Sequence, residues 1–253
     1  MEFTASATPP TPMKTLLLLI ALAAPLFAGF DHSHALFTNI LKNHVKGDGF
    51  DYAALHKDPD KLGAYLVDLS KVSQSEFKSW SEDQEMAYLI NLYNAGTLKL
   101  IIDNYPLKSI KDIRSPWKKK AIKLFGADRS LDYVEHDLLR KNYSDPRIHF
   151  GVNCASIGCP ALRNEAFQAA NLDKQLDEQA RKFLNDTSKN RVDNKRGVLY
   201  LSSIFDWFKG DFVKKSGSLE KFVAPYFGDS ERKAIQSGRL KIKNTNYDWN
   251  LNK

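Results

Sequence analysis

The chain has 253 residues, and its 37 lysines and arginines against 30 aspartates and glutamates give a formal net charge of +7. The positive charge is spread along the chain without a nucleic-acid-binding motif, so composition does not favour a nucleic-acid partner. The motifs of P-loop nucleotide binding, of the GxSxG nucleophile turn and of the HExxH zinc helix are all absent. One dense basic run, Trp117–Lys123, is interpreted as a solvated face, with an anionic partner or membrane surface as the alternative.

The amino end has the pattern of a secretory signal peptide. Lys14 closely precedes thirteen apolar residues, Leu16–Ala28. As a helix they would span about 20 Å, which is short of the roughly 30 Å hydrocarbon core. We therefore expect residues 1–28 to be a removed signal peptide with an upstream extension at 1–12, and the protein to be exported, periplasmic or secreted. A membrane anchor is the weaker interpretation, and no later apolar run is long enough to span a bilayer.

The first long periodic segments predict helices. Residues 31–46 and 58–72 have apolar positions at helical spacing and are expected to be packing helices. Residues 81–102 begin with a capping box, formed by a serine and a glutamine three positions later. This third helix is apolar on almost every side, so it belongs inside the domain.

Two amides interrupt the predicted central helix, Asn91 and Asn94, and they fall on one flank of it. A buried amide without a partner costs about 1–3 kcal/mol, so each should be hydrogen-bonded. Either they brace neighbouring backbone, or they orient a catalytic group or bind substrate. The sequence leaves both interpretations open.

Downstream of the central helix, short strands and helices alternate without a βαβ order. A hairpin is predicted around the GADR turn, followed by a short helix at 131–140 that carries Glu135 and His136. The alternation in RIHFGV predicts a strand at 147–152. The remaining predicted elements are a helix at 172–184, a hairpin at 191–201, the helix IFDWFKGDF, short helices between 218 and 237 and a final strand in RLKIKNTNYDWNLN. This order predicts an α+β fold with a mainly antiparallel sheet.

Both cysteines of the chain lie in HFGVNCASIGCP, residues 149–160. Along a strand, His149 and Asn153 would share one face, and Cys154 would lie where the strand becomes a loop. A nucleophilic cysteine needs a lowered pKa or a nearby base, which His149 or His136 would supply. In this interpretation Glu135 orients the histidine, while Asn91, Asn94 and Asn153 are polar stabilisers.

A disulfide between Cys154 and Cys159 is the structural alternative. Exported proteins commonly oxidise their thiols, and bridging this loop of six residues stabilises the fold by about 2 kcal/mol in the chain-entropy model. The bridge requires the ASIG segment to fold back as a turn. A thioredoxin-type redox pair is disfavoured because it uses two intervening residues, whereas four intervene here. His32 and His34 complete no familiar zinc spacing, so neither a metal nor another cofactor is predicted.

The sequence resembles the DUF547 family, a domain of unknown function, over nearly all of residues 29–253. The segment DPRIHFGVNCASIGCPALR at 145–163 carries the most specific match. The other matching segments are FDHSHALF (30–37), DYAAL (51–55), YLINLYNAGTLKLI (88–101), SLDYVEHDLLR (130–140), LYLSSIFDWFKGDF (199–212) and NYDWNLN (246–252). The resemblance implies one globular domain, in a family found as exported bacterial proteins and as modules of plant proteins, and it implies no activity.

The buried helix beside an antiparallel sheet also has a looser similarity to papain- and transglutaminase-like folds. In those folds the nucleophilic cysteine starts the central helix. Here that helix carries asparagines and no cysteine, so an active site would be rearranged, with Cys154 reaching it from a strand end.

The sequence thus predicts one of two functions. The first is a cysteine-dependent hydrolase or acyltransferase with a Cys/His pair and a small-molecule or peptide ligand. The second is a non-catalytic binding or scaffolding domain in which a Cys154–Cys159 disulfide acts as a clasp. The sequence does not predict an oligomeric state.

Overall fold

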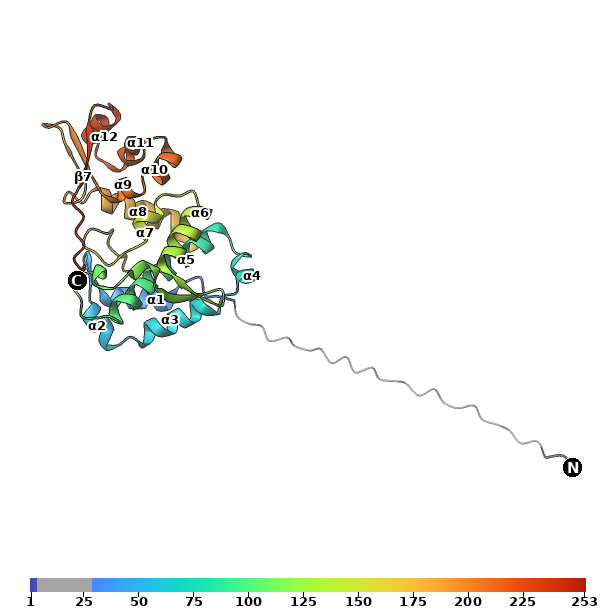
Figure 1. Ribbon diagram of the computed structural model, residues 1–253. Coiled ribbons are helices and arrows are strands. Elements are labelled where there is room, and N and C mark those ends of the chain that lie inside the picture. The colour runs from blue at the N-terminus through green and yellow to red at the C-terminus, as the bar shows by residue number, and fades with distance from the viewer. Residues whose placement is uncertain (4–28) are drawn as a thin grey trace.

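The computed structural model describes residues 1–3 and 29–253 (Figure 1). Apart from its first three residues, the predicted signal peptide with its upstream extension lies outside the described residues. Within the described part of the chain, no helix has the length and apolar character needed to cross a membrane.

The chain order begins with helices, as predicted. The first elements are α1 (Ala35–His44), β1 (Val45–Lys46), β2 (Gly49–Phe50), α2 (Tyr52–Lys57), α3 (Asp60–Lys71), α4 (Gln74–Phe77) and α5 (Glu82–Ile102). Short elements follow: η1 (Ile110–Asp112), η2 (Pro116–Lys118), β3 (Lys120–Leu124), β4 (Ala127–Ser130), the π-helix η3 (Tyr133–Leu139), α6 (Arg140–Asn142) and α7 (Ile148–Gly151).

The last part of the chain mixes helices with a small sheet. Its elements are η4 (Ala169–Asn171), α8 (Leu172–Leu184), β5 (Arg191–Asp193), β6 (Val198–Ser202), α9 (Ile204–Trp207), α10 (Lys209–Ser216), α11 (Leu219–Val223), η5 (Ala224–Tyr226), α12 (Asp229–Gln236) and β7 (Lys241–Thr245).

The strands form three small sheets rather than one. The β1–β2 and β3–β4 hairpins are antiparallel, and β6 pairs with β5 in the antiparallel and with β7 in the parallel sense. The predicted α+β class with mainly antiparallel pairing is therefore confirmed.

The central helix α5 is buried on nearly all sides, as its apolar circumference predicts. Its capping box is formed: the Ser81 hydroxyl accepts from the Gln84 backbone N–H, and the Gln84 side chain accepts from the Ser81 N–H. The helix packs against the β3–β4 hairpin at Gly96. A Cβ on Gly96 would lie 2.5 Å from the Ile122 side chain, so a glycine is needed for this close approach.

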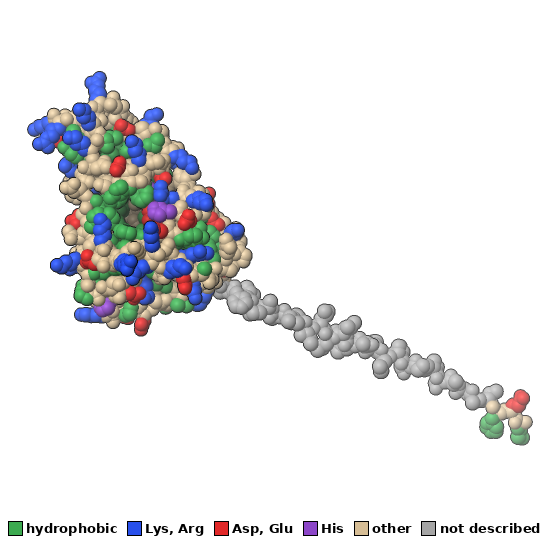
Figure 2. Space-filling model, in the orientation of Figure 1, with side chains coloured by type: hydrophobic (Ala, Val, Ile, Leu, Met, Phe, Trp, Pro, Cys, Tyr) green, Lys and Arg blue, Asp and Glu red, His purple; other side chains and the backbone are tan. Residues whose placement is uncertain are grey.

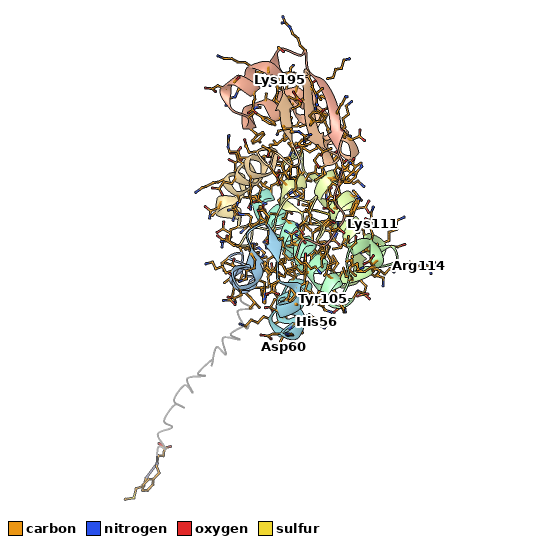
Figure 3. The ribbon with its side chains drawn as sticks, turned by 90° about the vertical axis from the view of Figure 1, so that its left-hand side faces the viewer. His56, Asp60, Tyr105, Lys111, Arg114 and Lys195 are labelled. Carbon is orange, nitrogen blue, oxygen red and sulfur yellow. A yellow bond between two sulfur atoms is a disulfide. The ribbon has the colours of Figure 1, made fainter. Side chains whose placement is uncertain are left out.

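The core consists of two hydrophobic clusters. One surrounds α5 and includes α1–α3, and the other joins α8–α12 to β6. In Figure 1, α1–α3 and α10–α12 occupy opposite ends of the molecule, with α5 and α7 between them. Figure 3 places Asp60, at the start of α3, and Lys195, in the β5–β6 turn, at the same two ends.

The segment after β7 connects the two clusters. Figure 1 shows it running from β7 back to the C-terminus beside α2. The backbone N–H of Leu251 donates to the Lys108 carbonyl, and that of Asn252 donates to the Ala155 carbonyl. Residues 246–252 therefore lie against the loop between Cys154 and Cys159, the cysteine loop. They do not continue the final strand, which ends at Thr245.

The prediction of a strand at RIHFGV is wrong, because Ile148–Gly151 form the short helix α7. Its alternating apolar residues face two different clusters: Phe150 belongs to the second, while Ile148 and Val152 belong to the first. A short helix buried on both sides gives the same alternation as a half-buried strand. His149 and Asn153 therefore do not share a strand face.

Candidate functional site

A cavity of about 240 Å³ lies where the two hydrophobic clusters meet. Figure 2 shows hydrophobic side chains gathered around a hollow beside a histidine on this face. Clefts between two packed units are common ligand sites. The cavity is lined by Tyr93, Trp117, Asp132, Glu135, His136, His149, Val152, Cys154, Cys159, Pro160, Ile204, Trp207, Phe208, Tyr247 and Trp249.

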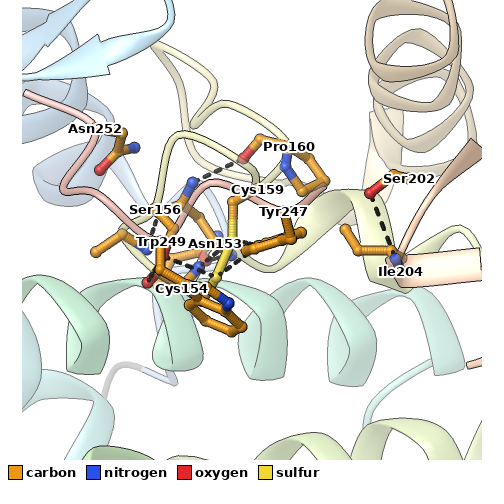
Figure 4. Close-up of a disulfide and its surroundings, with 12 residues drawn as sticks. Asn153, Cys154, Ser156, Cys159, Pro160, Ser202, Ile204, Tyr247, Trp249 and Asn252 are labelled. Carbon is orange, nitrogen blue, oxygen red and sulfur yellow. Dashed lines mark hydrogen bonds between the residues drawn. A yellow bond between two sulfur atoms is a disulfide. The ribbon is translucent and has the colours of Figure 1, made fainter. Parts of the chain in front are cut away.

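The two cysteines form a disulfide in the cavity wall (Figure 4). Their Cα atoms are 6.2 Å apart, within the range that a bridge requires. The ASIG loop folds back at Ala155, whose φ is +59°, and the Ala155 N–H donates to the Asn153 side chain. Cys159 is buried, whereas Cys154 is partly exposed. Both cysteines line the cavity, and Cys154 is the more exposed of the two.

Tyr247 covers the disulfide from the C-terminal segment. Its hydroxyl lies 3.1 Å from the sulfur of Cys154 and 3.1 Å from that of Cys159. Burial, with a smaller contribution from the Glu135 charge, raises the pKa of Tyr247 well above its usual value. The phenol therefore keeps its proton and can donate to a sulfur.

Gly158 allows Tyr247 to lie this close. A Cβ at Gly158 would be 2.9 Å from three ring carbons of the tyrosine, a distance that real Cβ contacts do not show. The Gly158 N–H also donates to the Asp248 carbonyl at 2.8 Å. The glycine is thus required by the close approach of the C-terminal segment.

His149 is held by a carboxylate that the sequence analysis did not name. Its Nε2 lies 2.8 Å from Asp211 Oδ2, and its ring stacks on Phe208 with 4.0 Å between centroids. The Nδ1 atom is buried and has no hydrogen-bond partner within the described residues. The arrangement resembles the orientation of a general base, in which one ring nitrogen is fixed and the other is left to act.

Asp211 also binds the Arg140 guanidinium. Arg140 donates to both carboxylate oxygens, at 2.6 and 3.2 Å. Burial alone would raise the pKa of Asp211, but the hydrogen bonds and charges of His149 and Arg140 outweigh it and hold that pKa well below its usual value. The carboxylate is therefore ionised at neutral pH and favours the imidazole orientation observed.

His136 lies on η3 at the rim of the cavity, with its side chain 43% exposed. Its Nδ1 is 2.9 Å from the Arg140 guanidinium. Because a guanidinium only donates, this nitrogen accepts and the proton is on Nε2. The Nε2 atom lies 4.0 Å from Asp132.

Glu135 is buried in the same wall but is hydrogen-bonded to neither histidine within the described part of the chain. Its partner is Tyr93, whose pKa is raised by burial and then by the charge and hydrogen bond of Glu135. The carboxylate in the position expected for an orienter of His149 is Asp211.

The three asparagines hold backbone segments and do not line the cavity. Asn91 donates to the Phe167 carbonyl and accepts from the Phe167 N–H. Asn94 donates to the Gly151 carbonyl and accepts from the Asn153 N–H. The Asn153 side chain donates to the Pro160 carbonyl and accepts from Ala155 within the cysteine loop. Together they fix both ends of the segment that carries the disulfide.

The remaining histidines of the sequence analysis lie outside the cavity. His34 is buried near the start of α1, with Nδ1 2.7 Å from the Tyr65 hydroxyl, and the His32 ring packs edge-on against Trp80. Across residues 1–3 and 29–253, no group of three or more His, Cys, Asp or Glu side chains is arranged to hold a metal ion.

The comparison with protein families matches residues 77–184 to the family described as "Protein of unknown function, DUF547". This confirms the resemblance drawn from the motifs, three of which lie within the matched range. No curated protein and no solved structure matches the chain. The looser similarity to papain- and transglutaminase-like folds therefore stays a prediction.

Proposed function

We propose a function from the cavity itself, since residues 77–184 match the DUF547 family, whose description states no function. The protein is an exported cysteine-dependent hydrolase or acyltransferase, with Cys154 as nucleophile and His149 as general base. One observation carries the proposal: the same cavity is lined by both cysteines and by a histidine whose ring is fixed by a carboxylate.

The disulfide form is a resting state in this proposal. A dithiol reductant supplies two electrons and two protons, which leaves Cys154 and Cys159 as thiols and the reductant as a disulfide. Cys154 is the more exposed of the two cysteines. Its partner Cys159 accepts the Cys154 backbone N–H at 2.9 Å, so the structure already contains a donor for a Cys159 thiolate leaving group.

After reduction, His149 takes the Cys154 proton and the thiolate attacks the acyl carbon. The leaving group departs with the proton from the imidazolium, and water or another acceptor then releases the thioester. Asp211 stays ionised and stabilises the imidazolium between these steps. The Tyr247 hydroxyl, adjacent to both sulfurs, is the donor placed to stabilise the oxyanion.

His149 is favoured over His136 as the base. The carboxylate partner of His149 is at hydrogen-bond distance, whereas Asp132 lies 4.0 Å from His136. The Nδ1 atom of His136 is already occupied by Arg140. His136 at the rim is better placed to contact substrate than to activate the thiol.

The proposed export is supported by two observations. The apolar segment before residue 29 has signal-peptide character, and a disulfide is stable in an oxidising compartment.

A second candidate is a non-catalytic binding domain in which the disulfide is a permanent clasp. It is favoured by the pairing of the bridged loop with the C-terminal segment through Ile157, Gly158 and Asn252. In that case the cavity binds a ligand without covalent chemistry.

The two candidates are separated by acyl labelling with p-nitrophenyl acetate, followed by peptide mass analysis. The enzyme proposal predicts an acetyl group on Cys154 after reduction. The Cys159→Ser variant, which cannot form the bridge, should be labelled without any reductant. The Cys154→Ser variant should remain unlabelled in both conditions. Labelling spread over surface lysines, with none on Cys154 in the Cys159→Ser variant, would support the clasp instead.

A further inference from the structure

We infer that the cavity selects ligands that carry a protonated amine. As a statement about substrates this rests on the proposed function, but binding of the amine does not require the thiol. The cavity lining contains two carboxylates, Asp132 and Glu135, and two histidines, and it contains no lysine or arginine. The chain as a whole carries a net charge of +7. The ionisable lining of the cavity is thus acidic, whereas the protein as a whole is basic.

Glu135 is a buried carboxylate without a cationic partner. It is 8% exposed, and it takes part in no ion pair within the described residues. Its hydrogen-bond partner Tyr93 is a neutral phenol. A buried charge is costly unless it is paired, so the wall at Glu135 favours a ligand that brings a positive charge.

Asp132 adds a second acceptor at the same wall. Its one ion-pair contact within the described residues is with His136 Nε2 at 4.0 Å, and that ring is a neutral imidazole when its Nδ1 accepts from Arg140. An ammonium group has several N–H donors to share between the two carboxylates.

The cavity lining is also rich in aromatic side chains, which independently suit a cation. Trp249 packs against Tyr247 with ring centroids 4.6 Å apart, against Trp207 at 5.7 Å and against Trp117 at 5.7 Å. Trp207 is nearly half exposed, which is unusual for so large an apolar side chain. Aromatic faces beside carboxylates attract ammonium groups through the ring quadrupole.

Within the described part of the chain, three cations contact residues of the cavity lining, and none of them replaces such a ligand. Lys189 donates to the Cys159 carbonyl at 3.2 Å and is paired with Asp186. Lys111 lies over the Trp249 ring at 3.9 Å, and Arg140 lies over the Phe208 ring at 4.9 Å. Neither lines the cavity. Arg140 is engaged by Asp211 and His136, so it does not neutralise Glu135. The volume of about 240 Å³ admits a small group. The substrate class is therefore an acyl compound with a protonated amine near the scissile bond.

The test is a calorimetric titration of the disulfide-bonded protein with three probes of similar shape: benzylamine, benzyl alcohol and benzoate. The cation should bind at least about tenfold more tightly than the neutral alcohol. Quenching of the cavity tryptophans gives a second readout, because three of the four tryptophans line the cavity. Equal affinity for amine and alcohol, tighter binding of benzoate, or no binding of any probe would each overturn the inference.

Glu135→Gln should abolish the preference for the cation, with Asp137→Asn as the matched control. Asp137 lies two residues away on the same helix η3, is exposed and does not line the cavity. An equal loss of the preference for the cation in both variants would indicate a general effect of charge. That result would contradict an amine-binding site at Glu135. If Glu135→Gln does not fold, Asp132→Asn replaces it, and the wild-type comparison of probes remains decisive. Repeating the titration with Cys154→Ser separates this inference from the proposed catalysis, because amine binding should persist there.

Discussion

At the residue scale, the Asp211 carboxylate contacts two side chains, His149 and Arg140. It orients His149 inside the cavity and binds Arg140, which in turn contacts His136 at the rim. One partly buried carboxylate thus fixes the position of His149 directly and that of His136 through Arg140. A change at Asp211 should therefore alter the reactivity of the cavity without removing any group that touches substrate.

His34 should make the fold sensitive to mild acid. Burial, with a smaller contribution from His32, lowers the pKa of His34 to about 4. Below pH 6.5 the unfolded chain binds this proton while the folded chain does not, so stability falls between about pH 6.5 and 4. The loss is roughly 3 kcal/mol for a shift of this size. Urea unfolding at pH 7 and pH 4.5 measures it.

The pH dependence should shrink in the His34→Gln variant and persist in the His56→Gln control, whose side chain is exposed. An unchanged difference between the two pH values in His34→Gln would show that other groups cause it.

Gly158→Ala tests the contact between the cysteine loop and Tyr247. The added methyl group would lie 2.9 Å from the ring, so the C-terminal segment must shift. We expect a loss of about 1–3 kcal/mol in the free energy of unfolding, as for other overpacked sites. Gly210→Ala is the matched control because no atom lies within 4 Å of its added Cβ, and in α10 it should be neutral or slightly stabilising. Equal stabilities of the two variants would contradict this account of Gly158.

At the element scale, α5 positions the site through Asn94. Its amide joins the helix to Gly151 and Asn153, the backbone just before the disulfide. Asn94→Ala leaves two buried backbone groups without partners, which should cost about 2–4 kcal/mol. Asn104→Ala, at an exposed position after α5, removes one local hydrogen bond and should cost less than about 1 kcal/mol. Chemical denaturation of both variants measures the difference in the free energy of unfolding. Similar losses would show that Asn94 stabilises the fold no more than a local hydrogen bond does.

Elements with a strong local pattern could be predicted from the sequence. The Ser81 capping box and the all-round apolar face identify α5 and its burial, and the GADR turn identifies the β3–β4 hairpin. The segment 148–151 could not be predicted correctly, because its apolar residues alternate between two clusters that form only in the folded chain. Local periodicity does not distinguish a short helix buried on two sides from a half-buried strand.

At the scale of the whole molecule, the cavity is built from segments far apart in the sequence. The cysteine loop, η3, α9 with the following Phe208, and the C-terminal segment each contribute to it. The sequence identified Cys154, Cys159, His149, His136 and Glu135 as candidates, and all five line the cavity. It did not identify Asp211, because no spacing in the sequence indicates which of many carboxylates will approach His149. The contact of Tyr247 with the disulfide could not be predicted either, because it depends on the path of the chain after β7.

The central claim is that the cavity activates Cys154. The most direct measurement is the rate of iodoacetamide alkylation of Cys154 across pH 5–9 in the Cys159→Ser variant, where it is the only thiol. We expect alkylation at pH 7 roughly tenfold faster than that of an unstructured cysteine peptide, because in the proposed mechanism His149, which lines the same cavity, accepts the thiol proton. Adding His149→Gln or Asp211→Asn should slow it, whereas adding His56→Gln should not. A rate equal to that of the peptide, unchanged by His149→Gln, would contradict the account.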